Sequence, residues 1–435
     1  MKKQEYGIDA LLGFLSEGKT PFHAVAACEK CLTDAGFTPL SEGDAWNLTP
    51  GAGYFVTRNR SSILAFRAPR DELRGFMIAA SHTDSPTFRV KHEPTAGVAG
   101  GLLRLNVEGY GGMILSSWLD RPLTLAGRLT VREDGAIRTK LVFVDRDLCV
   151  IPSVAIHLNR EVNKGYSYNP AIDLQPLLGT EGGDLLAAVA DAAGVARDAI
   201  LSFDLSLCDR SPGVVFGLAN EFFSSPRIDD LECVFGTLAG FLSADAPKNG
   251  VVPLFCAFDN EETGSGTRQG AASDFLSSAV ARIARAAGKE PERLYPSSFL
   301  VSADNAHARH PNHPELSDGA NAPDLNRGIV IKHAASQKYA TDAVSDAIFS
   351  EICRRAGAPV QHFQNRSDIP GGSTLGNIST AQLPVGSVDI GLAQLAMHSA
   401  RETAGVRDFE ALVLSMTRFF SSAVVCDGDG EYRVL

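Results

Sequence analysis

The chain has 435 residues, of which 44% are hydrophobic and 21% charged, so it is long and apolar enough to bury the core of two or three domains. This composition excludes a fibrous repeat and a disordered tail. The 51 acidic and 40 basic side chains give a formal charge of −11, which argues against a nucleic-acid partner or an anionic membrane.

Targeting and redox signals favour the cytoplasm. Glu5, Asp9 and Glu17 interrupt any signal-like apolar stretch, and no later stretch reaches about 18 uncharged apolar residues. Eight cysteines in 435 residues are too sparse for a disulfide framework. Cys28 and Cys31 have the spacing of a redox or zinc motif, but no second pair accompanies them, so we expect one face of a packed helix. We therefore expect a cytoplasmic protein without a membrane partner.

Short apolar runs alternate with helical patterns along most of the chain. The runs are bounded by turn residues and predict buried parallel strands. Of the helical patterns, 271–287 is closed by Gly288, whereas 342–356 opens after Thr341 as N-cap and ends at Gly357. This alternation predicts an α/β fold with a mixed, mostly parallel sheet flanked by helices. The predicted strands are 76–80, 251–258, 298–303, 329–332 and 386–390.

The segment from about 94 to 215 has a different character. Two alternating runs surround Asp134 and Gly135, a strong local signal for a β-hairpin, and one clear helix, 184–193, ends at Gly194. Runs of strands separate from alternating strands and helices when the layers of a protein differ. The predicted domains are therefore a discontinuous catalytic domain, 1–93 and 216–435, and a β-rich insertion, 94–215.

Polar residues directly follow several of the apolar runs. In an open parallel sheet the ligand site lies beyond the carboxyl ends of the strands, where such residues can converge. Burying several carboxylates side by side is costly unless a cation neutralises them. The sequence therefore predicts a metal site at this edge of the sheet. The polar segments are 81–84, 259–262, 304–307 and 397–399.

Two of these segments suggest a division of roles. His82 and Asp84 have the spacing in which a strand-end histidine binds a metal while a carboxylate two positions later holds its second ring nitrogen. Glu261 and Glu262 would repel one another, unless one binds the metal and the other acts as a base. The alternative is that this pair begins a helix.

Three other patterns resemble known sites only in part. Residues 264–270 and 371–376 depart from the spacing of a dinucleotide loop and of a serine nucleophile elbow, respectively. His310 and His313 could suggest a third metal, but on a proline-rich loop we expect exposed surface histidines.

Six longer motifs occur along the chain: SHTDSP (81–86), SSPRIDDLE (224–232), DNEETGSGTRQGA (259–271), SADNAHARHPN (302–312), RSDIPGGST (366–374) and DIGLAQLAMHSARE (389–402). Together they resemble the M18 family of aminopeptidases, the aspartyl aminopeptidase group. The similarity extends from the N-terminal region to about Asp408 and includes the insertion. The resemblance implies a zinc-peptidase fold of the phosphorylase/hydrolase type with the insertion as an oligomerisation domain.

The same resemblance implies a centre with two zinc ions. Asp229 would bridge both ions, His82 and Asp304 would complete one of them, and Glu262 and His398 would complete the other. Such oxygen and imidazole ligands suit a catalytic zinc site, and they also suit Mn²⁺ or Co²⁺.

The remaining site residues are likewise implied by the family. Glu261 would be the general base and Asp84 would orient His82. His307, Lys332 and Tyr339 would line the substrate pocket, and His157 of the insertion would reach the active site of a neighbouring subunit.

The resemblance implies a tetrahedral homododecamer that releases N-terminal residues, with the family's preference for Asp and Glu, from short peptides. Lys332 would attract the acidic side chain, and the alternative is a solvated lysine at a strand end. A related dinuclear carboxypeptidase or deacylase remains an alternative. So does a non-catalytic oligomeric shell or cargo protein, although Glu261 and all five ligands are present.

Overall fold

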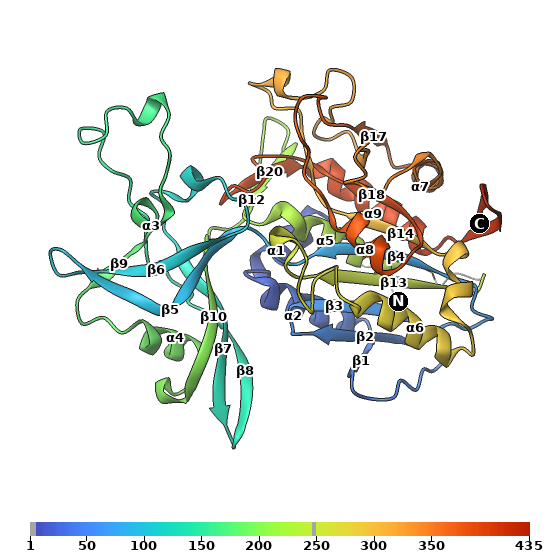
Figure 1. Ribbon diagram of the computed structural model, residues 1–435, viewed down its shortest axis with the longest axis horizontal. Coiled ribbons are helices and arrows are strands. Elements are labelled where there is room, and N and C mark those ends of the chain that lie inside the picture. Colours follow the sequence, from blue (N-terminus) through green and yellow to red (C-terminus); the bar gives the residue numbers. More distant parts are fainter. Residues whose placement is uncertain (1–5, 246–248) are drawn as a thin grey trace. The chain divides into compact units, whose positions relative to one another are not determined.

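The computed structural model describes residues 6–245 and 249–435 (Figure 1). Residues 1–5, part of the N-terminal stretch in which the sequence predicts no signal segment, lie outside the described residues. The chain divides into two compact units. The first unit contains the described residues up to Asp84, Gly213–Met397 and Glu402–Leu435, and the second contains Ser85–Pro212 and His398–Arg401.

A nine-stranded mixed sheet forms the centre of the first unit. Its central strands are buried on both faces: in β4, Phe76 and Ile78 belong to one hydrophobic core, whereas Met77 and Ala79 belong to the other. Burial on both faces explains why these strands are continuous apolar runs in the sequence. In sheet order the strands are β1 (Thr38–Leu40), β2 (Gly53–Arg58), β3 (Ser62–Arg67), β13 (Val251–Phe258), β4 (Gly75–His82), β14 (Phe299–Ala303), β18 (Gly386–Gly391), β16 (Ile329–Lys332) and β17 (Val360–Phe363).

Helices cover both faces of this sheet (Figure 1). The core on one face includes residues of α1 (Ile8–Glu17), α2 (Pro21–Asp34), α5 (Ile228–Ser243), α7 (Ala343–Ala356) and α9 (Val406–Phe420). The core on the other face includes residues of α6 (Phe275–Ala286) and α8 (Leu375–Gln382). The predicted α/β fold with a mixed sheet flanked by helices is confirmed. Cys28 and Cys31 both lie in α2 against the first of these cores, as free thiols.

Two details differ from the sequence prediction. The run 329–332 forms β16, but β16 is antiparallel to β18 and parallel only to β17. An apolar run carries no information about strand direction, which the connections decide. The N-cap of α7 is Asp342 rather than Thr341, and its carboxylate accepts hydrogen bonds from the backbone of Val344 and Ser345. The Thr341 hydroxyl instead accepts a hydrogen bond from the backbone nitrogen of Asp389.

Two smaller sheets complete the first unit. The larger has the order β11 (Val214–Phe216), β12 (Phe222–Ser225), β20 (Glu402–Gly405), β19 (Ala393–Leu395) and β15 (Ala306–His307). The smaller is the hairpin of β21 (Val424–Gly428) and β22 (Glu431–Val434). Within the described parts of the chain, no helix combines the length and the apolar character needed to cross a bilayer.

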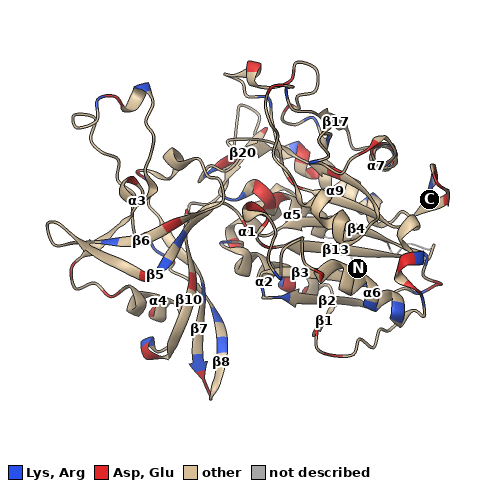
Figure 2. Cartoon of the chain, viewed as in Figure 1, with Lys and Arg blue, Asp and Glu red and all other residues tan. Residues whose placement is uncertain are grey.

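The second unit is built on an antiparallel sheet. The predicted hairpin turns at Asp134 and Gly135, whose positive φ values of 51° and 75° fit the tight turn. The predicted helix ends at Gly194 in the left-handed conformation. The sheet order is β8 (Ala136–Phe143), β7 (Thr124–Glu133), β10 (Ile200–Cys208), β5 (Thr87–Val98), β6 (Leu102–Tyr110) and β9 (Leu177–Thr180), and the helices are α3 (Pro170–Asp173) and α4 (Leu185–Ala193). Figure 2 shows acidic and basic residues interspersed along both units.

Candidate metal centre

Three neighbouring parallel strands carry the first set of site residues. β13 and β14 both pair with β4 in parallel register, so the carboxyl ends of these strands meet at one edge. His82 is the last residue of β4, Asp304 directly follows β14, and a short 3₁₀ helix, Glu261–Thr263, follows β13. The two glutamates therefore do begin a short helix, at the edge where the sequence predicts a metal site.

His82 is the centre of this cluster and is only 1% exposed. Its Nε2 lies 3.3 Å from Oδ1 of Asp229, and its Nδ1 lies 3.0 Å from the carbonyl oxygen of Asp84. A contact of Nδ1 with Asp84 fixes the ring so that Nε2 points at Asp229, which is the orientation that a histidine ligand requires.

The fully buried carboxylate of Asp84 holds the two glutamates as well as the histidine. Its Oδ1 accepts a hydrogen bond from the backbone nitrogen of Glu261 at 3.1 Å, and its Oδ2 accepts one from Glu262 at 3.2 Å. Oδ1 also lies 3.4 Å from Nδ1 of His82, so one carboxylate contacts three of the predicted site residues.

Asp230 belongs to the same cluster, although the sequence analysis did not assign it. It lies beside Asp229 in the first turn of α5, is completely buried, and accepts a hydrogen bond from the backbone nitrogen of His82 at 3.1 Å. Ligand atoms of His82, Asp229, Asp230 and Asp304 lie within 4.8 Å of one another. The signal in the sequence was the Asp-Asp pair of the PRIDD motif, of which only the first residue was assigned.

The pKa values in this cluster reflect crowded negative charge. Burial lowers the pKa of His82, but attraction by Asp230 and hydrogen bonds to Asp229 and Asp84 outweigh it, so the pKa is well above its usual value. Burial raises the pKa of Asp230 strongly, and repulsion by Asp304 adds to this effect. The pKa of Asp304 is raised mainly by burial, against the attraction of Lys332.

Glu261 has a pKa of about 7, because burial and repulsion by the surrounding aspartates outweigh the attraction of His82. Ligand atoms of Glu261, Glu262 and His82 lie within 4.8 Å of one another, as do those of Glu262 and Asp229. A cluster with so many carboxylates is stabilised by a cation in place of protons. Its oxygen and imidazole donors are those of catalytic zinc sites, so the residues present fit zinc.

Lys332 is buried rather than solvated, since only 2% of it is exposed. Its Nζ donates a hydrogen bond to the carbonyl oxygen of Asn305 at 2.8 Å and lies 3.7 Å from Oδ1 of Asp304. It also lies 5.5 Å from the ring centroid of Tyr339. Burial lowers the pKa of Lys332, but Asp304 and Tyr339 outweigh burial and raise it. The alternative of a solvated strand-end lysine is therefore wrong.

Tyr339 and His307 both lie near Phe363. Tyr339 is 4% exposed, its ring centroid lies 6.3 Å from that of Phe363, and burial raises its pKa. His307 is exposed at the end of β15, with its ring 6.5 Å from that of Phe363. The structure thus brings Lys332 next to Asp304 and Tyr339, and it brings Tyr339 and His307 next to Phe363.

A hydrogen-bond network connects the cluster to buried polar side chains around it. The sequence analysis assigned no role to these side chains. Nδ2 of Asn305 donates to Glu232 at 3.2 Å and to Gln394 at 3.0 Å. Gln394 donates to Glu402 at 3.3 Å, and Glu402 accepts a hydrogen bond from the backbone nitrogen of Asp229 at 3.0 Å. Three separate motifs contribute these residues (224–232, 302–312 and 389–402), so only the fold shows that they are bonded to one another.

Two of the predicted site residues lie in the second unit. Nδ1 of His398 lies 2.7 Å from the carbonyl oxygen of Gly112. His157 is exposed on a loop. Both assignments stay predictions.

Comparisons with known proteins agree with the chemistry of the cluster. The family model described as aminopeptidase I zinc metalloprotease (M18) matches residues 14–420. A probable M18 family aminopeptidase 2 from Clostridium novyi (strain NT) is 44% identical over 421 residues, covering 94% of this chain and 97% of the relative. A protein of the same name from Clostridium acetobutylicum is 40% identical over 434 residues, covering 97% and 100%.

Solved structures agree as well. The chain resembles one from the complex of Ape4 and Nbr1, with a TM-score of 0.91 at 37% identity, covering 94% of this chain and 84% of the other. The crystal structure of prApe1 has a TM-score of 0.90 at 29% identity and coverages of 95% and 93%. The mApe1 dodecamer of S. cerevisiae has a TM-score of 0.83 at 28% identity, with 95% of each chain covered. The protein with this buried histidine and carboxylate cluster therefore belongs to the M18 family of zinc metallo-aminopeptidases.

Proposed function

We propose that this aminopeptidase releases N-terminal residues, with a preference for Asp and Glu, from short peptides, and that Glu261 is its general base. The observation that carries the proposal is the position of Glu261. The backbone nitrogen of Glu261 donates a hydrogen bond to Asp84 at 3.1 Å. The carboxylate of Glu261 lies beside His82 and has a pKa of about 7. A base is most effective when its pKa is close to the working pH.

Two zinc ions per chain are part of the proposal. Asp229 would bridge them, with His82 and Asp304 on one ion and Glu262 and His398 on the other. Zinc bound there would supply a Lewis acid that polarises the peptide carbonyl and acidifies water. The clustering of His82, Asp229 and Asp304 within 4.8 Å supports the first ligand set.

The residues of the chain would act in sequence during hydrolysis. A carboxylate oxygen of Glu261 takes the proton of the attacking water and passes it to the nitrogen of the leaving amine. Asp84 keeps Glu261 and His82 in place throughout, because it contacts the backbone of the first and the ring of the second. Asp84 is therefore a positioning residue.

Lys332 supports the acidic preference. An ammonium group has three donors, of which one binds the carbonyl oxygen of Asn305, while Asp304 lies 3.7 Å away as an ion-pair partner. We propose a remaining donor for the carboxylate of an N-terminal Asp or Glu, in a pocket completed by Tyr339 and His307. A buried ammonium interacts more strongly with such a carboxylate than a solvated one would.

We also propose a cytoplasmic homo-oligomer, a tetrahedral dodecamer in which the second unit makes subunit contacts. The loop around His157 supports this assembly because it exposes apolar side chains: Val154 is 52% exposed, Ile156 47% and Leu158 83%. In the dodecamer, His157 would reach the active site of a neighbouring subunit. The eight free cysteines suit a reducing compartment.

The test uses the zinc-loaded full chain and a matched pair of neighbouring variants. We expect EDTA to abolish release of free Asp from aspartyl peptides. Glu261→Gln should keep its zinc and lose about 10²- to 10⁴-fold in kcat. Glu262→Gln should lose zinc as well as activity, because Glu262 is a proposed ligand.

Other outcomes would replace the proposal. Loss of zinc from Glu261→Gln would make Glu261 a ligand instead of the base. Activity on C-terminal or N-acylated substrates alone would indicate a carboxypeptidase or deacylase. A zinc-loaded protein inactive on every peptide would indicate a non-catalytic shell.

A further inference from the structure

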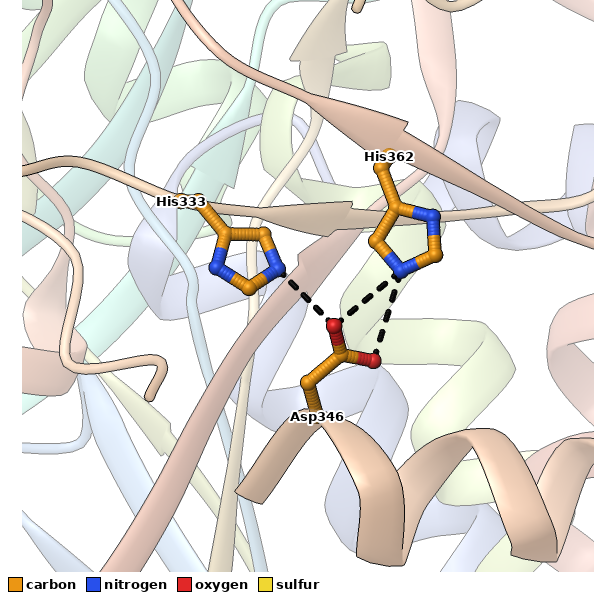
Figure 3. Close-up of side chains that lie close together, drawn as sticks. All are labelled: His333, Asp346 and His362. Atoms are coloured by element: carbon orange, nitrogen blue, oxygen red, sulfur yellow. Dashed lines mark hydrogen bonds and ion pairs between the residues drawn. The ribbon is translucent and has the colours of Figure 1, made fainter. Parts of the chain in front are cut away.

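A second cluster of histidine and carboxylate side chains lies in the first unit (Figure 3), and it shares no residue with the metal centre. We call His333, Asp346 and His362 the outer cluster. Nε2 of His333 lies 3.0 Å from Oδ2 of Asp346, and Nε2 of His362 lies 3.1 Å from the same oxygen. Among residues 6–245 and 249–435 it is the one set of three potential metal ligands that does not involve the metal centre.

The backbone brings the two histidines together. β16 and β17 are parallel neighbours, with Ile331 opposite His362, and the backbone nitrogen of His333 donates to the carbonyl oxygen of Phe363 at 2.9 Å. His362 lies in β17 and His333 directly follows β16, so the two rings project from adjacent segments of chain, with centroids 5.7 Å apart. Their separation is set by the sheet, not by flexible loops.

The third ligand is held equally firmly. Asp346 lies in the first part of α7, which begins with a capping box formed by Asp342 and Ser345. The hydroxyl of Ser350 donates to Oδ1 of Asp346 at 2.8 Å. Partial burial raises the pKa of Asp346, but hydrogen bonds from Ser350 and His362 outweigh it and lower the pKa below its usual value. The carboxylate is thus ionised and oriented at neutral pH.

The chemistry of the outer cluster suits a transition metal. Two imidazole nitrogens and one carboxylate oxygen lie within 4.8 Å of one another. The three side chains are 23%, 21% and 48% exposed for His333, Asp346 and His362, so water can complete the coordination. Such mixed nitrogen and oxygen sets with open positions bind zinc and related divalent ions, whereas Mg²⁺ and Ca²⁺ favour oxygen ligands alone.

We propose that the outer cluster binds one divalent transition-metal ion, such as Zn²⁺, independently of the metal centre. An ionised carboxylate only accepts hydrogen bonds, so without metal each Nε2 donates its proton to Asp346. When the metal binds, these hydrogen bonds break, each neutral ring carries its proton on Nδ1 instead, and both Nε2 atoms and the carboxylate bind one ion. The ion would join α7 to β16 and β17, next to Lys332. It would therefore stabilise this edge of the sheet by binding the folded state.

The test is a difference in zinc content between variants of the full chain. Wild type, His362→Ala and Asp346→Asn are equilibrated by dialysis at pH 7.5 with the same free zinc, and bound zinc is measured by mass spectrometry. We expect both variants to bind one ion per chain fewer than the wild type. Zinc should also raise the Tm of the wild type more than that of either variant. Because the readout is a difference, it does not depend on how many ions the metal centre holds.

His313→Ala is the matched control, since His313 is also exposed and lies 3.1 Å from a carboxylate, that of Glu315. This variant should bind as much zinc as the wild type. Equal zinc content in the wild type and His362→Ala would overturn the proposal, and so would an equal loss in His313→Ala, which would indicate unspecific binding to surface histidines. Peptidase activity retained in His362→Ala shows that the variant is folded.

Discussion

Two clusters in the first unit contain the same kinds of side chain in opposite environments. The metal centre surrounds His82 with aspartates that are at most 7% exposed, whereas His362 of the outer cluster is 48% exposed. In the metal centre the pKa of Asp230 is raised well above its usual value. In the outer cluster the pKa of Asp346 is lowered.

The difference shows how burial and charge balance decide what a cluster requires. Several carboxylates around one buried histidine repel each other, and protons relieve this repulsion only partly, so the metal centre needs divalent cations. One carboxylate between two histidines, close to water, is satisfied by hydrogen bonds. A metal there competes with protons and is optional for the fold.

The largest expected effect comes from the same substitution made in each cluster. Asp229→Asn removes a charge that both ions of the metal centre would share, so we expect loss of zinc from that centre and a fall in kcat/KM of about 10³-fold or more. Asp346→Asn should change kcat/KM by less than about 2-fold, because the outer cluster takes no part in the reaction. Peptide hydrolysis and zinc content measured on both variants provide the comparison. Equal activity losses in the two variants would remove the proposed distinction between the clusters.

A smaller effect is expected at Lys332, which lies beside Asp304 of the metal centre and belongs to the proposed substrate pocket. Lys332→Met should lower kcat/KM for aspartyl peptides by about 10²-fold more than for leucyl peptides, because only the former lose a buried partner of opposite charge. Some loss on both substrates is expected, since Lys332 also lies 3.7 Å from Asp304. If the losses were equal, Lys332 would support Asp304 and would not select the substrate.

The last prediction concerns stability instead of activity, and it separates the effect of burial on a pKa from that of crowded charge. Asp408 is completely buried, and burial raises its pKa to about 7 against backbone hydrogen bonds from Gly328 and Asn326. Between about pH 4 and pH 7, Asp408 therefore keeps its proton in the folded chain but has lost it in the unfolded chain. This contribution to the free energy of unfolding, at most about 4 kcal/mol, is fully present below about pH 4 and is lost as the pH rises to 7.

Asp408→Asn should reduce this pH dependence, because an amide does not titrate. The variant should also be less stable at every pH, since one acceptor oxygen is replaced by a donor. Urea unfolding at pH 5 and pH 7.5 distinguishes the two effects. Loss of the titration changes how the free energy of unfolding varies with pH, whereas loss of the acceptor lowers this free energy by the same amount at both pH values. If the free energy of unfolding varied with pH as in the wild type, burial alone would not raise the pKa of Asp408. Repulsion between neighbouring carboxylates would then be required for the raised pKa values in the metal centre too.

Much of the fold could be predicted because local patterns report burial. The runs at β4, β13 and β14 are apolar at every position since both faces of the sheet are covered. Gly194 and Gly357 end helices in the left-handed conformation, as their positions after helical patterns predict. The direction of β16 could not be predicted, because it depends on connections and not on residue type.

The metal centre was predictable to the extent that its residues follow strands. His82 ends β4, Asp304 directly follows β14, and Glu261 begins the short helix after β13. Strands that pair in parallel bring such residues together. Asp230 was missed because burial at the start of α5, not sequence position, makes it part of the cluster. The assignments of His157 and His398 stay predictions, as do the domain boundaries.

The sequence by itself determined the α/β alternation, the polar residues at the ends of three central strands and the M18 family, because hydrophobic period and motif spacing are local properties. Only the tertiary structure decided that Lys332 is buried against Asp304, that a carboxyl network lies behind the metal centre, and that His333, Asp346 and His362 meet. These three residues lie 13 and 16 positions apart with no shared motif. Their proximity arises from strand pairing and helix packing, which place side chains in contact without leaving a local pattern in the sequence.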